Sequence, residues 1–423
     1  MSRGNGKQPR RRVVVTGIGA VSPNGVGTEA FWRATRNGIS GVDTIASFDA
    51  APLACHIAGE VKDFHPEHYL APKDLKRTGR AVPLGIAAAQ EALQSAGLEA
   101  PMTLEEKRSW GVILGSGGGT PDFTEAQYRL YFSDQLRKAS AYNISSSTMG
   151  TLSSEISLHF DFRGPSHVIS TGCTSSTDAI GYAFNLIRFG LADRLVTGGV
   201  DAAITPGIMQ GFSIMRVISI SHNDAPGKAS RPFDRRRDGF VLGEGAWMLV
   251  LEDEERALAR GARIRGEVLG YASTCDAYHM VRGDPSGEEP ARAMALALED
   301  ADVAKDEVGY IALHGTSTVL NDKTETLAVK LCFGARAYDI PMSSIKSMIG
   351  HPQGASGAAG LAAALFALSD RFLPPTINYE EPDPECDLNY IPNRGIAADA
   401  EVALCNCIAF GSKNSALVIR RCG

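Results

Sequence analysis

Short apolar runs alternate with amphipathic segments along most of the chain, and glycines or serines come after most of these runs. The run that starts after Arg12, VVVTGIGAVSPNG, is rich in β-branched residues and ends in a Gly, Ser and Pro turn. This pattern predicts a buried strand followed by a loop, and segment 28–36 then predicts a helix. The chain therefore begins as a strand, loop and helix unit.

The same order of elements returns through the first half. An Ala-rich amphipathic segment, 81–96, precedes the apolar run GVILGSGGG at 111–119. The run PSHVISTGCTSS then breaks into small residues, and DAIGYAFNLIRFG predicts a helix that ends at Gly190. DRLVTGGVDA adds one more short strand.

The second half repeats the pattern, although not the residues. RIRGEVLGYAS and VGYIALHGTST predict strands on either side of a helix at 289–300, and PMSSIKSMIGH, a helix at 354–369 and the strands VALCNCIAF and ALVIRR come next. This alternation predicts an α/β protein with mainly parallel sheets covered by helices. The charged segment 252–262 separates two expected halves, 12–260 and 261–423. It does not resemble a flexible linker, so we expect the halves to pack tightly.

Composition limits the functions open to the chain. Its 423 residues, 44% of them hydrophobic, can form two packed units or one duplicated core. With 42 Lys plus Arg against 48 Asp plus Glu, the net charge of −6 argues against nucleic acid as a partner. Any anionic partner must therefore meet a local basic patch.

Cysteine usage and the start of the chain bear on its location. Eight scattered cysteines without a CxxC pair argue against disulfides or a zinc site and favour a reducing, cytoplasmic compartment. Residues 1–11 predict a disordered basic tail. No apolar stretch that could be a signal peptide or span a bilayer comes after it, so we expect no membrane association.

Cys173 is the first candidate for chemistry, because STGCTSSTDAI places it between a predicted strand and a predicted helix start. The helix dipole at such a position lowers a thiol pKa and favours nucleophilic attack. A small buried cysteine among small neighbours is the alternative interpretation.

Two histidines come after apolar strands and lie in Gly and Ser loops: His314 in ALHGTSTVLNDKTE and His351 in KSMIGHPQGASGAAG. Catalytic groups are often displayed at strand ends, although a loop histidine is more commonly exposed or structurally satisfied. Lys346, Asp322 and Glu325 could set the orientation and protonation of the two imidazoles. The strand and turn CNCIAFGSKNSAL could supply oxyanion donors from its backbone, or could be a plain strand end.

Taken together, six motifs resemble the β-ketoacyl carrier-protein synthases of the elongating type over residues 12–421. They are VVVTGIGAVSPNG, GPSHVISTGCTSS, RPFDRRRDGFVLGEGAWMLVLE, HGTSTVLNDKTE, KSMIGH and CNCIAFG. The resemblance implies a thiolase-like five-layered α-β-α-β-α fold of two similar halves that forms a tight dimer.

The resemblance also implies a role for each residue in decarboxylative Claisen condensation. Cys173 would be the acylated nucleophile, His314 and His351 would support malonyl decarboxylation, and Lys346 would act electrostatically. The backbone amides of Cys173 and Ile408 would form the oxyanion hole. The implied supporting, pantetheine-binding and carrier-docking residues are, in turn, Asp322, Glu325 and Phe410; Thr316 and Thr318; and Lys73, Lys76, Arg77 and Arg80.

Such chemistry needs no metal and no organic cofactor, because the acyl groups travel on the phosphopantetheine of an acyl carrier protein, and acyl-cysteine storage predicts ping-pong kinetics. TGCTSSTDAIGYA is closer to the ketosynthase subunits of type II polyketide systems, aromatic or polyene, than to fatty-acid enzymes with TACAT or TACAS. Those subunits pair with a chain-length factor that lacks the cysteine, so we expect a heterodimer.

Other interpretations stay open beside this one: a homodimeric fatty-acid elongating synthase, a non-catalytic chain-length-determining subunit, and a thiolase that uses no carrier. An acyl hydrolase is disfavoured because the chain has no GxSxG elbow. Two positions also depart from the family pattern. Ile408 stands where we expect the gating phenylalanine, and Gly360 stands where many relatives carry glutamate, so we expect the gate and part of the polar network to differ.

Overall fold

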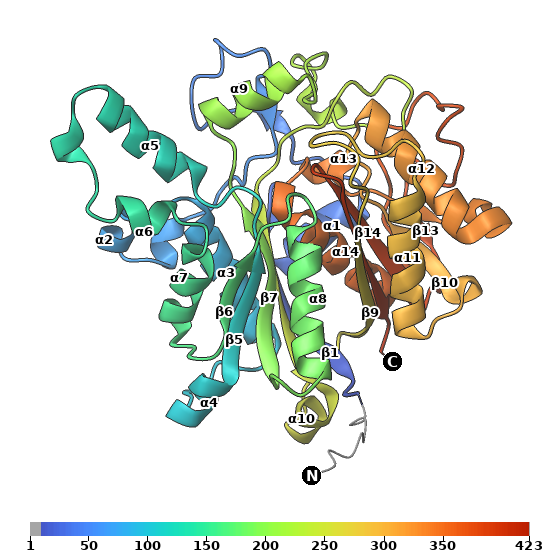
Figure 1. Cartoon of the computed structure of the whole chain (residues 1–423), viewed down its shortest axis with the longest axis horizontal. Helices are drawn as coiled ribbons and strands as arrows, with labels where there is room; N and C mark the ends of the chain where they lie inside the picture. Colours follow the sequence, from blue (N-terminus) through green and yellow to red (C-terminus); the bar gives the residue numbers. More distant parts are fainter. Residues whose placement is uncertain (1–9, 423) are drawn as a thin grey trace.

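A single 11-stranded sheet runs through residues 10–422, which the computed structural model describes (Figure 1). Hydrogen-bonded neighbours lie in the order β11-β10-β14-β15-β9-β1-β8-β7-β5-β6, and β2 pairs with β1. The strands are β1 (Val13–Ser22), β2 (Gly25–Val26), β5 (Trp110–Gly115), β6 (Ser166–Ile169), β7 (Arg194–Asp201), β8 (Gly245–Asp253), β9 (Gly266–Cys275), β10 (Val308–Ala312), β11 (Met342–Ser343), β14 (Val402–Ala409) and β15 (Lys413–Arg420).

The two halves of this sheet have the same strand order. Numbered within its own half, each runs 3-2-4-5-1, as β6-β5-β7-β8-β1 and as β11-β10-β14-β15-β9. In each half two pairings are parallel and two are antiparallel. Because the last strand of each half, β8 or β15, is antiparallel to both of its neighbours, the other four strands of that half run in one direction, as the prediction of mainly parallel sheets expects. The halves join where the start of β1 pairs with β9.

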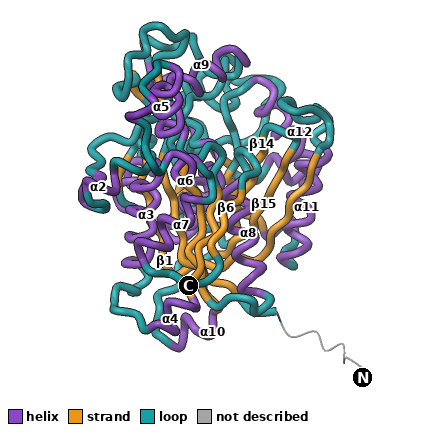
Figure 2. The backbone as a smooth tube through the Cα atoms, turned by 60° about the vertical axis from the view of Figure 1, so that its left-hand side comes forward, coloured by secondary structure: helices purple, strands orange, loops and turns teal. Residues whose placement is uncertain are grey.

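Helices cover both halves and also fill the space between them. α8 and α14 contact strands of both halves, α3 and α7 lie on the first half, and α11 lies on the second with α12 against it (Figure 2). The order is thus the thiolase-like five layers, α-β-α-β-α. The helices are α1 (Thr28–Arg36), α2 (Pro72–Leu75), α3 (Ala81–Ser95), α4 (Leu104–Ser109), α5 (Pro121–Phe132), α6 (Asn143–Ser147), α7 (Thr151–Phe160), α8 (Ser175–Arg188), α9 (Pro206–Met215), α10 (Glu254–Ala259), α11 (Glu288–Ala301), α12 (Val319–Phe333), α13 (Lys346–Ile349) and α14 (Ser356–Asp370).

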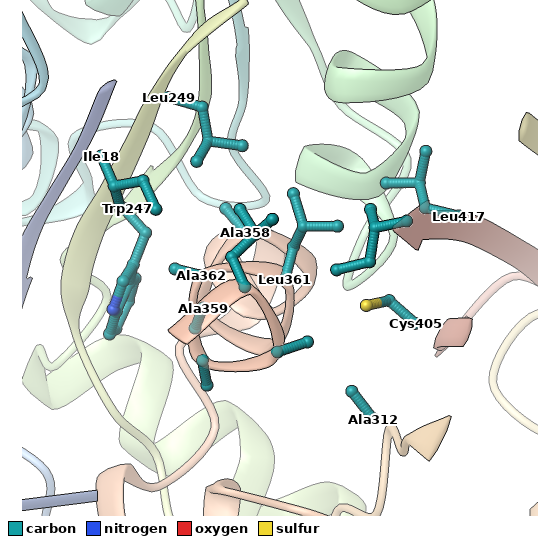
Figure 3. Packing of buried hydrophobic residues seen from close by; sticks show 14 of the residues in the cluster. Ile18, Trp247, Leu249, Ala312, Ala358, Ala359, Leu361, Ala362, Cys405 and Leu417 are labelled. Atoms are coloured by element: carbon teal, nitrogen blue, oxygen red, sulfur yellow. The ribbon is translucent and has the colours of Figure 1, made fainter. Parts of the chain in front are cut away.

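The central helix α14 is rich in alanine because it is covered on nearly every side. Figure 3 shows its small side chains between Trp247 of the first half and Cys405 and Leu417 of the second. Ala358 and Ala362 are fully buried there. Small residues let both sheet halves approach the helix axis closely. The loops that come after the strands of the two halves therefore lie near one another.

The remaining elements are short. Two-stranded sheets pair β3 (Asp43–Thr44) with β4 (Ile57–Ala58) and β12 (Phe372–Leu373) with β13 (Ile396–Ala397); the 3-10 helices are η1 (Pro66–His68), η2 (Leu136–Lys138), η3 (Pro226–Lys228), η4 (Lys305–Glu307), η5 (Gly334–Tyr338) and η6 (Gln353–Ala355). Most of the predicted tail, 1–9, lies outside the described residues, and Arg11 pairs with Asp193 at 2.8 Å. None of the helices in 10–422 has the length and apolar character that crossing a bilayer requires.

Candidate active site

Cys173 lies on the connection from β6 to α8, two residues before the helix begins. Its side chain is buried, with 5% exposed. Thr174, the N-cap residue, and Ser175 in the first turn are fully buried as well. The small residues after the strand thus place a thiol in the interior, at the end of one of the two central helices.

Both candidate histidines converge on this thiol. His351 Nε2 lies 3.2 Å from Cys173 Sγ, although 178 residues separate them. The His314 and His351 rings are perpendicular, with centroids 5.3 Å apart. One donor atom from each of the three side chains falls within 4.8 Å of the others. Such a donor set could also bind a soft divalent cation, but the charge of Lys346, which already acts on both histidines, disfavours more positive charge there.

Burial dominates the protonation of the trio. It raises the pKa of the Cys173 thiol to about 11, while the charge of Lys346 and nearby backbone N–H groups act in the opposite direction. The expectation that the helix start leaves Cys173 with a lowered pKa is therefore wrong. Burial also lowers the pKa values of His314 and His351 well below the usual value. At neutral pH the site holds a thiol and two neutral imidazoles, so a base must take the thiol proton before attack.

The backbone N–H that faces the Cys173 sulfur from the end of β14 is that of Phe410, two residues after the predicted donor Ile408. The backbone N–H groups of Phe410 and of Cys173 itself face the sulfur and lower its pKa. Ile408 lies inside β14 and pairs in register with Asn414. β14 ends at Ala409, the last residue that pairs with β15. The N–H of Phe410 is therefore the first that follows the paired residues of the strand. Phe410 lines the pocket together with Ile408, so an aromatic side chain is present there, and the expectation of an altered gate at Ile408 stays a prediction.

Buried polar groups hold the His314 loop through its backbone. Glu325 accepts hydrogen bonds of 2.7 Å from the N–H groups of His314 and Gly315 and from the Asn406 side chain. Lys346 Nζ donates to the His314 carbonyl oxygen at 2.7 Å. Burial raises the pKa of Glu325 to about 7. The predicted neighbours of the histidine thus fix where its loop lies.

Asp322 binds the backbone of the same loop two residues after His314. It accepts hydrogen bonds from the N–H groups of Thr316 at 3.0 Å and Phe233 at 2.8 Å, and Arg237 lies 3.5 Å away. The hydroxyls of Thr316 and Thr318 are 2.9 Å apart, and both residues line the pocket. The structure therefore brings the predicted pantetheine threonines to the approach to the thiol.

Sequence reasoning missed Asp201, which holds the His351 loop. This fully buried carboxylate accepts from the Ser116 hydroxyl at 2.8 Å and from the N–H groups of Gly117, Gly118 and Gly354 at 2.7 to 2.9 Å. Burial raises its pKa to about 6. Its partners are up to 153 residues away, and no local pattern around GGVDA signals such contacts.

A pocket of about 220 Å³ leads to the trio and is lined by Cys173, both histidines and Phe240 among others. Two exposed arginines, Arg216 and Arg282, also line it, and neither forms an ion pair with the residues of the described range. Isolated arginines in loops give no sequence signal, so both were missed. They make the approach to the thiol locally basic.

The four predicted docking residues differ in the contacts that they make. Arg80 binds Glu244 at 2.7 Å, and Arg77 binds Glu155 and Asp74. These two guanidiniums are held by carboxylates of their own chain, and their docking role stays a prediction. Lys73 and Lys76 remain exposed and form no ion pair in the described structure. They lie at α2, on the opposite flank from α12 and α13 (Figure 1), so the chain does not bring them to its own pocket.

Gly360, the other departure, lies in α14. A side chain there would meet no atom within 4 Å at its Cβ. The position therefore has room for a larger residue, and the polar contacts that hold the two histidine loops do not involve it.

Comparisons with known proteins agree over nearly the whole chain. A family model described as "Beta-ketoacyl synthase, N-terminal domain" matches residues 10–257, and its C-terminal counterpart matches 265–380. The chain is 41% identical over 414 residues to "3-oxoacyl-[acyl-carrier-protein] synthase 2" of Synechocystis sp., covering 97% of this chain and 98% of that protein. It is 42% identical over 422 residues to the "Tetracenomycin polyketide synthase ketoacyl synthase alpha subunit" of Streptomyces glaucescens, covering 98% of each.

Solved structures give the same result. "The ishigamide ketosynthase/chain length factor" matches with a TM-score of 0.90 at 34% identity, covering 98% of this chain and 100% of that one. A chain of the complex described as "type II PKS acyl-carrier protein in complex with its ketosynthase bound to the hexaketide" matches with a TM-score of 0.88 at 31% identity, covering 98% of this chain and 100% of that one.

Proposed function

Because this chain belongs to the β-ketoacyl synthase family, we propose that it is the condensing subunit of a type II polyketide system, with Cys173 as its acylated nucleophile. The chain is a ketosynthase, an acyl-transferring condensing enzyme, and ketosynthases use substrates bound to acyl carrier protein. One observation carries the residue assignment: the thiol of Cys173 and the imidazoles of His314 and His351 meet in one buried pocket.

In the first half-reaction His351 Nε2, 3.2 Å from the sulfur, takes the proton as Cys173 attacks the acyl thioester. The N–H groups of Cys173 and Phe410 hold the oxyanion. The tetrahedral intermediate collapses, the carrier leaves as a thiol with the proton from His351, and the acyl group stays on Cys173.

In the second half-reaction the malonyl thioester enters the emptied pocket, guided by Thr316 and Thr318. An imidazole N–H of His314 donates to the thioester oxygen, so the electrons left by departing CO₂ are held as an enolate. The enolate carbon attacks the acyl-cysteine carbonyl and expels the Cys173 thiolate, which a proton from solvent restores to the thiol. A thiol, two imidazoles and backbone donors complete this chemistry, so we propose that no metal or organic cofactor takes part.

A second chain of the same fold is the proposed partner. β6, the last strand at one edge of the sheet, is only partly covered, and Ile144 and Leu158 nearby in sequence are exposed. An uncovered strand edge beside apolar residues suits pairing with another chain. The likeness to a ketosynthase/chain length factor structure supports a paralogue that lacks the nucleophile.

Fatty-acid elongation as a homodimer is the second candidate, which the 41% identity to the Synechocystis enzyme favours. The subunit composition separates the two candidates. Native mass spectrometry of the chain alone, 44.9 kDa per copy, gives its oligomeric state, and a condensation assay on the same sample gives its activity. If a paralogue is required, no homodimer with condensing activity should be found. An active homodimer that extends short saturated acyl chains would replace the polyketide proposal with fatty-acid elongation.

Intact-mass spectrometry tests the nucleophile. The protein is incubated with an acyl carrier protein and then with malonyl carrier protein, and Cys173→Ala serves as the control. We expect an acyl adduct on the wild type that malonyl carrier protein discharges, and no adduct on the variant. An adduct on Cys173→Ala would overturn the assignment of the nucleophile.

A further inference from the structure

A second thiol, Cys407, lies inside the site, and the two half-reactions do not use it. It belongs to β14 and is 1% exposed. Its sulfur is 3.1 Å from the carbonyl oxygen of Cys173 and 3.3 Å from Nδ1 of His314. Cys407 therefore contacts both the residue that carries the nucleophile and one of the two histidines.

The chemistry of these contacts depends on one hydrogen atom. Burial raises the pKa of Cys407 far above its usual range, so the group is a neutral thiol with a single S–H. If the S–H donates to the Cys173 carbonyl, the ring proton of His314 can lie on Nδ1 and point at the sulfur. If the S–H donates to Nδ1, the ring proton must lie on Nε2.

Two observations favour the second arrangement. In the first arrangement the S–H donates to the Cys173 carbonyl, and an Nδ1–H of His314 has only the sulfur, a weak acceptor, as its partner. In the second the Nδ1 lone pair accepts the S–H, and the carbonyl gives up this contact. His314 lines the pocket, and none of the hydrogen bonds among the described residues engages its Nε2. A proton on Nε2 would therefore be directed to the substrate.

We propose that Cys407 is a positioning residue that donates its S–H to Nδ1 of His314 and so keeps the ring proton on Nε2. The inference rests on the proposed function, in which that proton binds the malonyl thioester oxygen. His351 differs at the equivalent atom. The Ser356 hydroxyl, 2.9 Å from its Nδ1, can accept a hydrogen bond from a proton on Nδ1, which leaves Nε2 free to receive the proton of Cys173. The two imidazoles are thus held in opposite tautomers, one as base and one as donor.

Separate assays of the two half-reactions test this role. Cys407→Ala should form the acyl adduct within about threefold of the wild-type rate. It should decarboxylate malonyl carrier protein about 10- to 100-fold more slowly, which is less than the roughly 10²- to 10³-fold loss on removing an oxyanion donor itself, because the His314 ring remains. Cys407→Ser keeps an oriented O–H donor and should restore decarboxylation. Cys405→Ala is the matched control, because Cys405 is a buried cysteine two positions earlier in β14 that packs in the core.

The tautomer itself is read by ¹⁵N NMR of histidine-labelled protein, with the His314 signals assigned by their absence in His314→Gln. The wild type and Cys407→Ser should carry the proton on Nε2, and Cys407→Ala should shift it toward Nδ1. An Nδ1 proton in the wild type, an unchanged tautomer in Cys407→Ala, or unchanged decarboxylation in that variant would overturn the proposal. If the wild type neither forms an adduct nor decarboxylates malonyl carrier protein, the proposed function fails instead, and the NMR result still decides the tautomer.

Discussion

The two halves of the sheet share one strand order, yet the connections after equivalent strands differ between them. In the first half β6 leads within a few residues to Cys173 and the central helix α8. In the second half β11 leads to the other central helix, α14, through an added segment that contains Lys346 in α13 and then His351. The first connection has room for one thiol, and the longer second connection presents an amine and an imidazole to it.

Each half also contains a buried carboxylate next to a histidine loop of the site, Asp201 in the first half and Glu325 in the second. Asp201 ends β7 of the first half but binds Gly354 beside His351, which belongs to the second half. Glu325 of the second half binds the His314 loop of its own half. The comparison shows that the first half positions part of the second, and that a repeated architecture has become functionally unequal.

Replacing one histidine at a time should give the largest difference between the two halves of the molecule. His351→Ala should slow acyl transfer to Cys173 by about 10²- to 10⁴-fold, because a base is lost beside a thiol of high pKa. His314→Ala should leave acyl transfer nearly unchanged and lose decarboxylation. Time-resolved intact mass and CO₂ release measure the two steps. Equal loss of acyl transfer in both variants would show that the imidazoles do not divide the work.

Removing the buried carboxylates tests which half controls the site. Asp201→Ala and Glu325→Ala each leave backbone N–H groups buried without an acceptor, so each should lower the free energy of unfolding by about 2–4 kcal/mol in urea titrations. Condensation should fall further in Glu325→Ala, because that residue holds the N–H of His314 itself. The milder Glu325→Gln serves as its control, and a larger loss of turnover in Asp201→Ala would reverse the ranking.

The same carboxylates should give the two halves different pH dependence. Burial raises the pKa of Asp201 to about 6 and that of Glu325 to about 7, above the values of unfolded chains. A raised pKa stabilises the protein at low pH, and that stability is lost as pH rises through the folded value, on the order of 3 kcal/mol for each group. Urea unfolding between about pH 4 and 7 should show this decline, because it begins near the unfolded pKa values and ends at the folded ones. Glu325→Gln should flatten its upper part, and a wild-type profile that rises over this range would contradict the prediction.

The smallest effect concerns the surface. Lys73 and Lys76 lie on the first half, away from the pocket, so we expect Lys76→Glu to leave kcat unchanged. Because the substitution reverses a charge that would attract an acidic carrier protein, it should raise the KM for carrier protein about two- to fivefold. The increase in KM should be smaller at high salt. Arg108→Glu, an exposed cation on α4, is the control. Equal effects in both variants would remove the docking role of Lys76.

Sequence reasoning identified the residues that stand at strand ends, because apolar runs followed by small residues mark such places. Cys173, His314 and His351 were predicted in this way, and the structure brings them into one pocket. Contacts made across the fold were missed. Asp201, Cys407 and the pairing of Arg80 with Glu244 depend on contacts between residues 83 to 234 positions apart. The backbone N–H next to the thiol belongs to Phe410, two residues beyond the predicted Ile408, because the end of β14 is set by its pairing with β15.

The seam between the halves has a consequence for engineering. Glu267 of β9 pairs with Val14 of β1 on one side and with Arg420 of β15 on the other, so the first and last strands of the sheet flank the same residue. Two strand spacings, about 10 Å, separate them. A short loop could bridge that gap, and the chain could then be reopened between β8 and β9. The resulting circular permutant would carry the histidine-bearing half before the thiol-bearing half. Every strand would keep its hydrogen-bonded neighbours, and only the order of the strands along the chain would change.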